Sequence, residues 1–181
     1  MNNEVLKAIA DRRSIRAYTD RPVNDEELGA LICAATQAPS AVNRQPYHFT
    51  FVRDKAVLDE FCQAWRNVSR QLNPDNPPSE DFNVFRGAPC VCFIFCDPLN
   101  GWSLVDSGIA VENLALAAHS MGLGSVILGM PKMLFEAAGK AWLQKLDCPA
   151  GMRFSVAIGI GTPAAGKDAH PVREGLVTIK G

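Results

Sequence analysis

The sequence has no basic excess and no long hydrophobic run. Its 181 residues hold 18 Lys and Arg against 19 Asp and Glu, a formal net charge of -1. Nucleic acids and anionic membrane surfaces are bound through a basic excess or a basic amphipathic face, so neither partner is expected. No apolar run is long enough to cross a bilayer, and the first dozen residues lack the apolar core of a signal peptide. We therefore expect a cytoplasmic protein.

Patterns that bind metal ions are also missing. Three of the six cysteines, Cys90, Cys92 and Cys96, lie in one apolar run, and a Cys-x-Cys pair followed by a distant Cys148 does not provide two Cys-x-x-Cys pairs. Cysteine is often simply a small core residue, and the cytosol keeps thiols reduced. We expect free structural thiols, no disulfide framework and no metal.

What is present is ordinary globular composition, 48% apolar and 20% charged, with no internal repeat and no second composition regime. One domain over residues 1–181 is the expectation. Apolar spacing, N-cap residues and runs of β-branched or aromatic residues predict the elements. The expected helices end near 12–14 and span about 24–38, 55–72, 103–121 and 133–146, and the second begins at Asn24, an N-cap residue with Glu27 three positions later. The expected strands span 47–52, 90–96, 126–128 and 154–160, and the continuous apolar run over 90–96 predicts a central strand covered on both faces.

The helix over 103–121 has a narrow polar stripe, in which Asp106, Asn113 and Ser120 recur every seven residues. A helix that is apolar around most of its circumference must be covered on most sides. In a domain this small, a second subunit is one source of that cover. Because helices and strands alternate without uniform β-helix-β units, we expect an α+β or mixed layer architecture.

The first candidate for chemistry is the segment Arg12-Arg13-Ser14-Ile15-Arg16, which places three guanidinium groups and a hydroxyl at the exit of a helix. Arginine forks match phosphate oxygens, so the segment can hold a phosphate. A solvated helix end with charge compensation explains the same residues.

The second candidate is the loop over residues 39–46, between a helix and a strand. Its amide side chains, Asn43 and Gln45, both donate and accept, which suits a ring edge with alternating carbonyl and N–H groups. A plain turn is the alternative explanation.

These two segments and a third, in this order, carry a resemblance. The segment over 12–16, the loop Ala-Pro-Ser-Ala-Val-Asn-Arg-Gln-Pro-Tyr-His-Phe over 38–49 and the stretch Asp-Ser-Gly-Ile-Ala-Val-Glu-Asn over 106–113, continuing to Ser125, resemble the FMN-dependent nitroreductase family over nearly the whole chain. The resemblance implies an α+β nitroreductase-like fold, with a central, mainly antiparallel β-sheet flanked by helices. It also implies an intertwined homodimer with two FMN sites, each built from both subunits.

The resemblance also implies the cofactor-binding residues. For the phosphate and pyrimidine side of FMN these are Arg12, Arg13, Ser14 and Arg16, with Arg173 as a second phosphate-binding position. The segment that the other subunit lays against the flavin contains Pro39, Ser40, Ala41 and Asn43, with Gln45 at its margin. Beside the flavin N5 lies the backbone of Leu128 and Gly129, where a residue without a side chain allows close approach.

The sequence departs from the family in two places. The segment over 73–86 has no clear counterpart of the asparagine or lysine that reaches the flavin in relatives. In the tail, Arg173 follows Pro171, where some relatives have a second basic residue, and Lys167 or His170 is the candidate substitute.

A competing motif is Gly159-Ile160-Gly161-Thr162-Pro163-Ala164, which fits the loose dinucleotide fingerprint G-x-G-x-x-A. Too little chain follows it for a β-helix-β unit, and no acidic residue lies about twenty positions on.

The histidines, His48, His119 and His170, pair with no Ser or Cys nucleophile at recognisable spacing. We interpret them as structural or surface residues.

The implied function is hydride transfer from NAD(P)H through FMN to a small planar electron acceptor such as a nitroaromatic or a quinone. The flavin carries this chemistry, so no catalytic side chain is expected. Two alternatives stay open: a flavoenzyme of the same fold with another reaction, such as dehalogenation, ene reduction or flavin breakdown, and a non-catalytic flavin-binding module.

Overall fold

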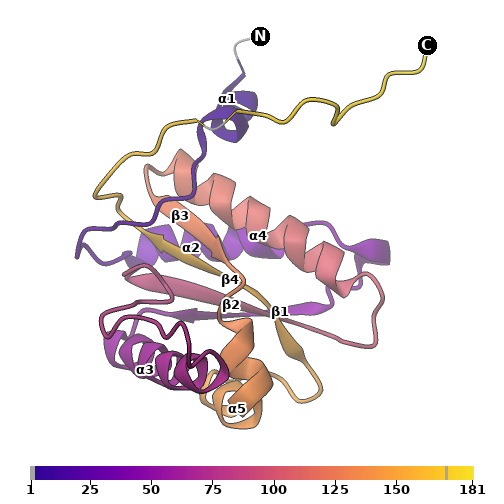
Figure 1. The fold of residues 1–181 in the computed structure, drawn as a ribbon. Coiled ribbons are helices and arrows are strands. Elements are labelled where there is room, and N and C mark those ends of the chain that lie inside the picture. Colours follow the sequence, from indigo (N-terminus) through magenta and orange to yellow (C-terminus); the bar gives the residue numbers. More distant parts are fainter. Residues whose placement is uncertain (1–2, 170) are drawn as a thin grey trace.

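An antiparallel sheet of four strands lies between two pairs of helices (Figure 1). The computed structural model describes residues 3–169 and 171–181. The strands have the order β1-β2-β4-β3, and each neighbouring pair is antiparallel. Their bounds are Tyr47–Val52 for β1, Cys90–Cys96 for β2, Gly124–Leu128 for β3 and Arg153–Gly161 for β4. The helices are α1 (Glu4–Asp11), α2 (Asp25–Thr36), α3 (Lys55–Leu72), α4 (Ser103–Ser120) and α5 (Lys132–Lys145), with a short 3-10 helix, η1 (Ala41–Asn43). The expected α+β class is confirmed.

The central strand β2 is buried along all of its seven residues. Val91, Phe93 and Phe95 belong to a core cluster with side chains of α3 and α5. Cys90, Cys92 and Ile94 belong to a second cluster, with side chains of α2 and α4. Successive side chains of a strand point to opposite faces of the sheet, so an uninterrupted apolar run requires cover on both faces, as the sequence predicted. All six cysteines are free.

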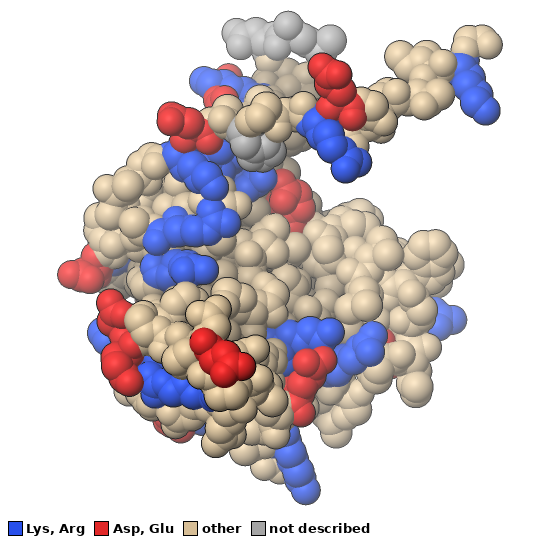
Figure 2. All heavy atoms as spheres, viewed as in Figure 1, with Lys and Arg blue, Asp and Glu red and all other residues tan. Residues whose placement is uncertain are grey.

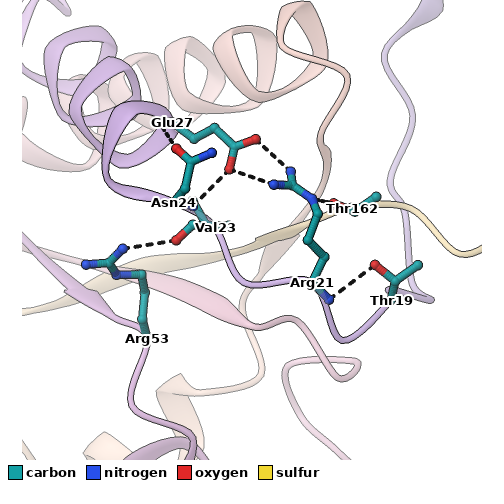
Figure 3. Close-up of polar contacts among 7 residues, drawn as sticks. All are labelled: Thr19, Arg21, Val23, Asn24, Glu27, Arg53 and Thr162. Atoms are coloured by element: carbon teal, nitrogen blue, oxygen red, sulfur yellow. Dashed lines mark hydrogen bonds and ion pairs between the residues drawn. The ribbon is translucent and has the colours of Figure 1, made fainter.

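A polar network holds the start of α2 against the end of β4 (Figure 3). The Asn24 side chain accepts from the Glu27 backbone N–H at 2.8 Å, and the Glu27 carboxylate accepts from the Asn24 N–H at 2.9 Å, which completes a capping box. Arg21 pairs with Glu27 at 2.6 Å and also donates to Thr162 Oγ1 at 2.6 Å. The predicted N-cap is confirmed.

The helix α4 contacts α2 and the sheet, and its inner positions are fully buried. Leu104, Val105 and Ile109 point away from the chain's own core, with exposed fractions of 53%, 52% and 37%. The chain therefore covers α4 only in part. No helix among the described residues has both the length and the apolar character needed to cross a membrane.

Apolar side chains are also uncovered at both ends of the chain. In α1, Val5, Leu6 and Ile9 are each at least half exposed. The tail after β4 leaves the sheet and runs as an extended segment on the side of the molecule where α1 lies (Figure 1). It exposes Leu176 and Ile179 among other apolar residues. Such surface is costly in water, so both ends are suited to an interface.

Candidate functional site

The segment over residues 12–16, called the arginine-rich segment below, lies beside the edge strand β3. Ser14 forms a parallel bridge with Ser125, and the Ile15 N–H donates to the Ser125 carbonyl at 2.8 Å. The Tyr18 hydroxyl donates to the Ile15 carbonyl at 2.8 Å. Figure 2 shows Lys and Arg side chains gathered below α1, where this segment runs in Figure 1. The fold therefore attaches the cationic segment to the sheet by backbone bonds, which leaves its side chains for other partners.

Two pockets flank this segment. Arg12 and Arg13 line one of about 310 Å³, together with His119 and Lys167. Ser14 and Arg16 line the other, of about 250 Å³, and Lys167 lines it too. Lys167 was one of two candidate substitutes in the sequence, and the fold places it between the two pockets. The other candidate, His170, lies outside the described residues.

The three arginines are engaged to different degrees. Arg13 donates to the carbonyls of Ala10 at 2.6 Å and Arg12 at 2.8 Å, so it serves the end of α1. Arg12 Nε lies 3.3 Å from a Glu112 carboxylate oxygen of α4, but this buried nitrogen makes no hydrogen bond. Arg16 makes one long bond of 3.4 Å, to the Ser14 carbonyl. Arg12 and Arg16 are therefore best placed to bind an anion.

Arg173, the other predicted phosphate-binding residue, is exposed in the extended tail. It is absent from the lining of both pockets beside the arginine-rich segment. Arg12, Arg13, Ser14 and Arg16 therefore line these two pockets, and Arg173 lines neither.

The loop over residues 39–45 has an unusual backbone. Val42, Asn43 and Gln45 have φ angles of 48°, 54° and 49°, in the left-handed region that residues with a side chain rarely adopt. Local bonds hold this shape: the Gln45 N–H donates to Ser40 Oγ at 2.8 Å, and the Ala41 N–H donates to Asp106 Oδ1 of α4 at 3.2 Å. Strained backbone of this kind clusters at binding sites.

The loop and the arginine-rich segment contact α4 at separate places. Ala41 contacts it at Asp106 and Arg12 contacts it at Glu112, six residues further along. At 1.5 Å and 100° per residue, these positions are about 9 Å apart along the helix and about 120° apart around it. One chain therefore presents the two predicted binding segments on different sides of α4.

The third predicted piece of the site is the end of β3. Leu128 is buried, whereas a Cβ added at Gly129 would meet nothing within 4 Å. The next residue, Met130, is held by its carbonyl, which accepts from the Trp65 indole N–H at 2.8 Å. The backbone at Gly129 is thus both open and anchored.

The sequence reading missed Arg86, the one basic residue of the 73–86 segment. Its guanidinium lies 5.0 Å from the Phe82 ring centre, and one nitrogen lies 3.9 Å from the Met130 sulfur. Arg86 has a φ of 61° and is followed by Gly87 at 76°. In the sequence, the signal for this basic group was an Arg-Gly pair three residues before the buried strand β2.

The glycines of the competing dinucleotide motif have a packing role. A Cβ at Gly159 would lie 2.9 Å from the Ala88 Cβ, and one at Gly161 would lie 2.5 Å from Pro89 Cδ. Both glycines therefore let β4 pack against the segment before β2. No helix follows β4 in the described residues, so the fingerprint lacks its structural context.

A family model, sequence relatives and solved structures are similar to this chain. The family model described as the Nitroreductase family matches residues 9–162. A protein of Archaeoglobus fulgidus that bears the name NADH dehydrogenase/NAD(P)H nitroreductase is 34% identical over 174 residues, which are 92% of this chain and 90% of that protein. A nitroreductase with bound FMN from Desulfitobacterium hafniense is 30% identical, with a TM-score of 0.86 and complete coverage of both chains. Another, from Bacteroides fragilis, is 26% identical, with a TM-score of 0.92 over 99% of this chain and 100% of that one.

Proposed function

Since the chain belongs to the nitroreductase family, we propose that it works as a homodimer that passes hydride from NAD(P)H, through FMN, to a nitroaromatic, quinone or similar planar acceptor. The chain is an FMN flavoprotein and an NAD(P)H-dependent flavin reductase of that family. The homodimer, the class of acceptor, the single domain over residues 1–181 and the roles of individual residues are the proposal.

One observation carries the proposal: the arginine-rich segment lies beside the start of β3, and Gly129 follows the end of the same strand. Ile15 bonds to Ser125 near the start of β3, and Gly129 follows the last residue of β3. Four residues of strand span about 13 Å. A flavin mononucleotide fits this spacing with its phosphate at Arg12, Arg16 and Lys167 and its ring beside Gly129.

Bound FMN supplies the centre that accepts and gives up hydride. The chain's residues bind and orient this group. Arg12 and Arg16 would place positive charge at its phosphate and so bind and orient it. The anchored backbone at Gly129 lets a flat ring approach without meeting a side chain. No side chain is assigned as an acid or base.

The second copy completes the site in this proposal. The loop over residues 39–45 meets α4 on a different side from Arg12. The flavin that this loop contacts is therefore the one bound by the arginines of the partner, and the contacting residues are Pro39, Ser40, Ala41, Asn43 and Gln45. The apolar side chains left exposed on α1, on α4 and in the tail support an extensive interface between copies. No separate nucleotide-binding domain is needed, because the nicotinamide then stacks on the open face of the flavin.

The test is a visible spectrum and a solution mass for the purified chain, followed by anaerobic titration with NADH and NADPH. We expect a yellow dimer whose flavin bleaches rapidly and regains its colour with a nitroaromatic or a quinone. A colourless monomer that takes up no added FMN would refute the proposal. A bound flavin that stays oxidised with both nucleotides would indicate a non-catalytic module. Reoxidation by a halogenated phenol, but not by nitroaromatics or quinones, would show a different reaction on the same fold.

A further inference from the structure

Asp106 is a buried acidic residue that is not among the cofactor-binding residues assigned above. It lies in the first turn of α4 with only 2% of its surface exposed. Burying a carboxylate is unfavourable unless it is paired or hydrogen-bonded. The described residues place no Lys, Arg or His within ion-pair distance of it, and the start of α4 supplies only the partial positive charge of the helix dipole. A buried aspartate in such a setting calls for an explanation.

Its hydrogen bonds indicate what the carboxylate does. Oδ1 accepts from the Ala41 N–H at 3.2 Å, and Oδ2 is buried without a hydrogen-bond partner among the described residues. The side chain thus makes one hydrogen bond, and that bond holds the loop over residues 39–45.

This loop needs such a hold because its conformation is unfavourable by itself. Val42 is β-branched and has a φ of 48°, and 85% of its surface is exposed, so burial within the chain does not compensate for the backbone strain. Asn43 and Gln45 are in the same left-handed region. Without an external anchor, the loop is expected to relax toward ordinary turn conformations.

A second anchor lies on the other side of Pro39 and Ser40. The Tyr47 hydroxyl donates to the Ala38 carbonyl at 2.9 Å. Burial raises the pKa of Tyr47, a hydrogen bond with Ser40 acts against this increase, and the nearby Asp106 charge adds to it. Tyr47 fixes Ala38, directly before Pro39, and Asp106 fixes Ala41, directly after Ser40. Pro39 and Ser40 are therefore held at both ends.

We propose that Asp106 is a positioning residue of the flavin site: through Oδ1 it holds Ala41, and with it the loop over residues 39–45, in the shape that contacts the cofactor. The inference rests on the proposed function, since it takes this loop to be the segment that the partner's flavin meets. Asp106 touches no reacting atom and acts through the loop.

The test compares Asp106→Ala and Asp106→Asn in the full-length protein by the dissociation constant for FMN, from quenching of flavin fluorescence. Asparagine keeps an oxygen that accepts from Ala41, whereas alanine removes it. We expect Asp106→Ala to bind FMN about 10- to 100-fold more weakly and Asp106→Asn to stay within about threefold of the parent. Ala41→Pro deletes the same bond from its donor side, at the first position of η1, where a missing N–H is tolerated. Ala41→Pro should therefore weaken FMN binding as Asp106→Ala does. It keeps the test valid if Asp106→Ala folds poorly.

Asp54→Ala is the matched control, because Asp54 also accepts from a backbone N–H, that of Ala56, at 2.8 Å, but at the start of α3. It should lower the melting temperature without changing the FMN dissociation constant. Asp106→Ala and Ala41→Pro variants that bind FMN like the parent would overturn the inference, and so would an Asp106→Asn as weak as Asp106→Ala. A parent protein that binds no FMN would overturn the proposed function itself, which separates the two failures.

Discussion

The backbone N–H of Ile15 donates a 2.8 Å hydrogen bond to the carbonyl of Ser125. This bond sets the arginine-rich segment in register with β3, and therefore with Gly129 at the far end of that strand. In the proposed site, the placement of the phosphate end relative to the ring end thus depends on tight packing around the first residues of β3.

Gly124→Ala should loosen this packing. A Cβ at Gly124 would lie 2.8 Å from Ile15 Cγ1 and 2.9 Å from Pro163 Cγ, closer than such atoms pack. We expect a loss of roughly 1–3 kcal/mol in the free energy of unfolding, as for other overpacked sites, together with weaker FMN binding. Chemical denaturation and FMN titration measure both. Gly139→Ala in α5, where an added Cβ meets nothing within 4 Å, should lose neither.

Arg16→Ala should weaken FMN retention. Arg16 lines the smaller pocket beside the segment and makes only a long bond to its own backbone, so its charge is available to a phosphate. Loss of charge-assisted bonds of about 1.5–3 kcal/mol corresponds to about 10- to 100-fold weaker binding. Flavin content after purification and a dissociation constant report the effect. Arg153→Ala, at the exposed start of β4, removes the same charge as a control. Equal flavin content in both variants would count against this role for Arg16.

Trp65→Phe should slow flavin reduction more than it weakens flavin binding. The Trp65 indole N–H holds the Met130 carbonyl at 2.8 Å, directly after Gly129, and phenylalanine has no donor. We expect about 1 kcal/mol less stability and a several-fold slower bleaching by NAD(P)H in stopped-flow measurements. Trp142→Phe shortens an aromatic side chain of the same core cluster, whose ring centre lies 4.7 Å from that of Phe61. It should lower stability without slowing flavin reduction. Identical reduction rates in both variants would contradict this prediction.

Stability should decline in alkaline solution. Burial raises the pKa of the Cys90 thiol from 9.0 to about 12, and burial also raises the pKa values of Cys92 and Tyr18. The unfolded chain releases these protons first. The stability that the protonated groups provide is therefore complete below about pH 9 and falls as the pH rises toward the raised values. Urea midpoints between pH 8 and about pH 11 measure the decline.

The slope identifies the groups responsible for that decline. Cys90→Ala removes a buried thiol and should flatten the alkaline loss, whereas Cys33→Ala removes an exposed thiol and should keep the slope of the parent. Equal slopes in all three proteins would show that other groups control the alkaline limit.

Much of the fold was predictable because its signals are local. The aromatic and β-branched run over Tyr47–Val52 and the apolar run over Cys90–Cys96 predicted both strands with their observed bounds, and Asn24 with Glu27 predicted the start of α2. The arginine-rich segment and the loop over residues 39–46 were also identified, as separate candidates.

Other parts of the site were not predictable from local patterns. Lys167 lies between the two pockets, and Arg86 approaches Met130, a residue 44 positions away in the chain. The bond between Ala41 and Asp106 joins residues 65 positions apart. No spacing rule connects such residues, because packing of the helices on the sheet brings them together.

The sequence by itself determined the type and order of the elements and the family, because periodicity, helix caps and ordered motifs depend on residues close together in the chain. Only the tertiary structure decided that the loop and the arginines face different sides of α4, since that depends on which turn of the helix each one meets. The same packing placed the arginine-rich segment beside the start of β3, the strand that ends just before Gly129, through backbone pairing between Ile15 and Ser125, 110 residues apart.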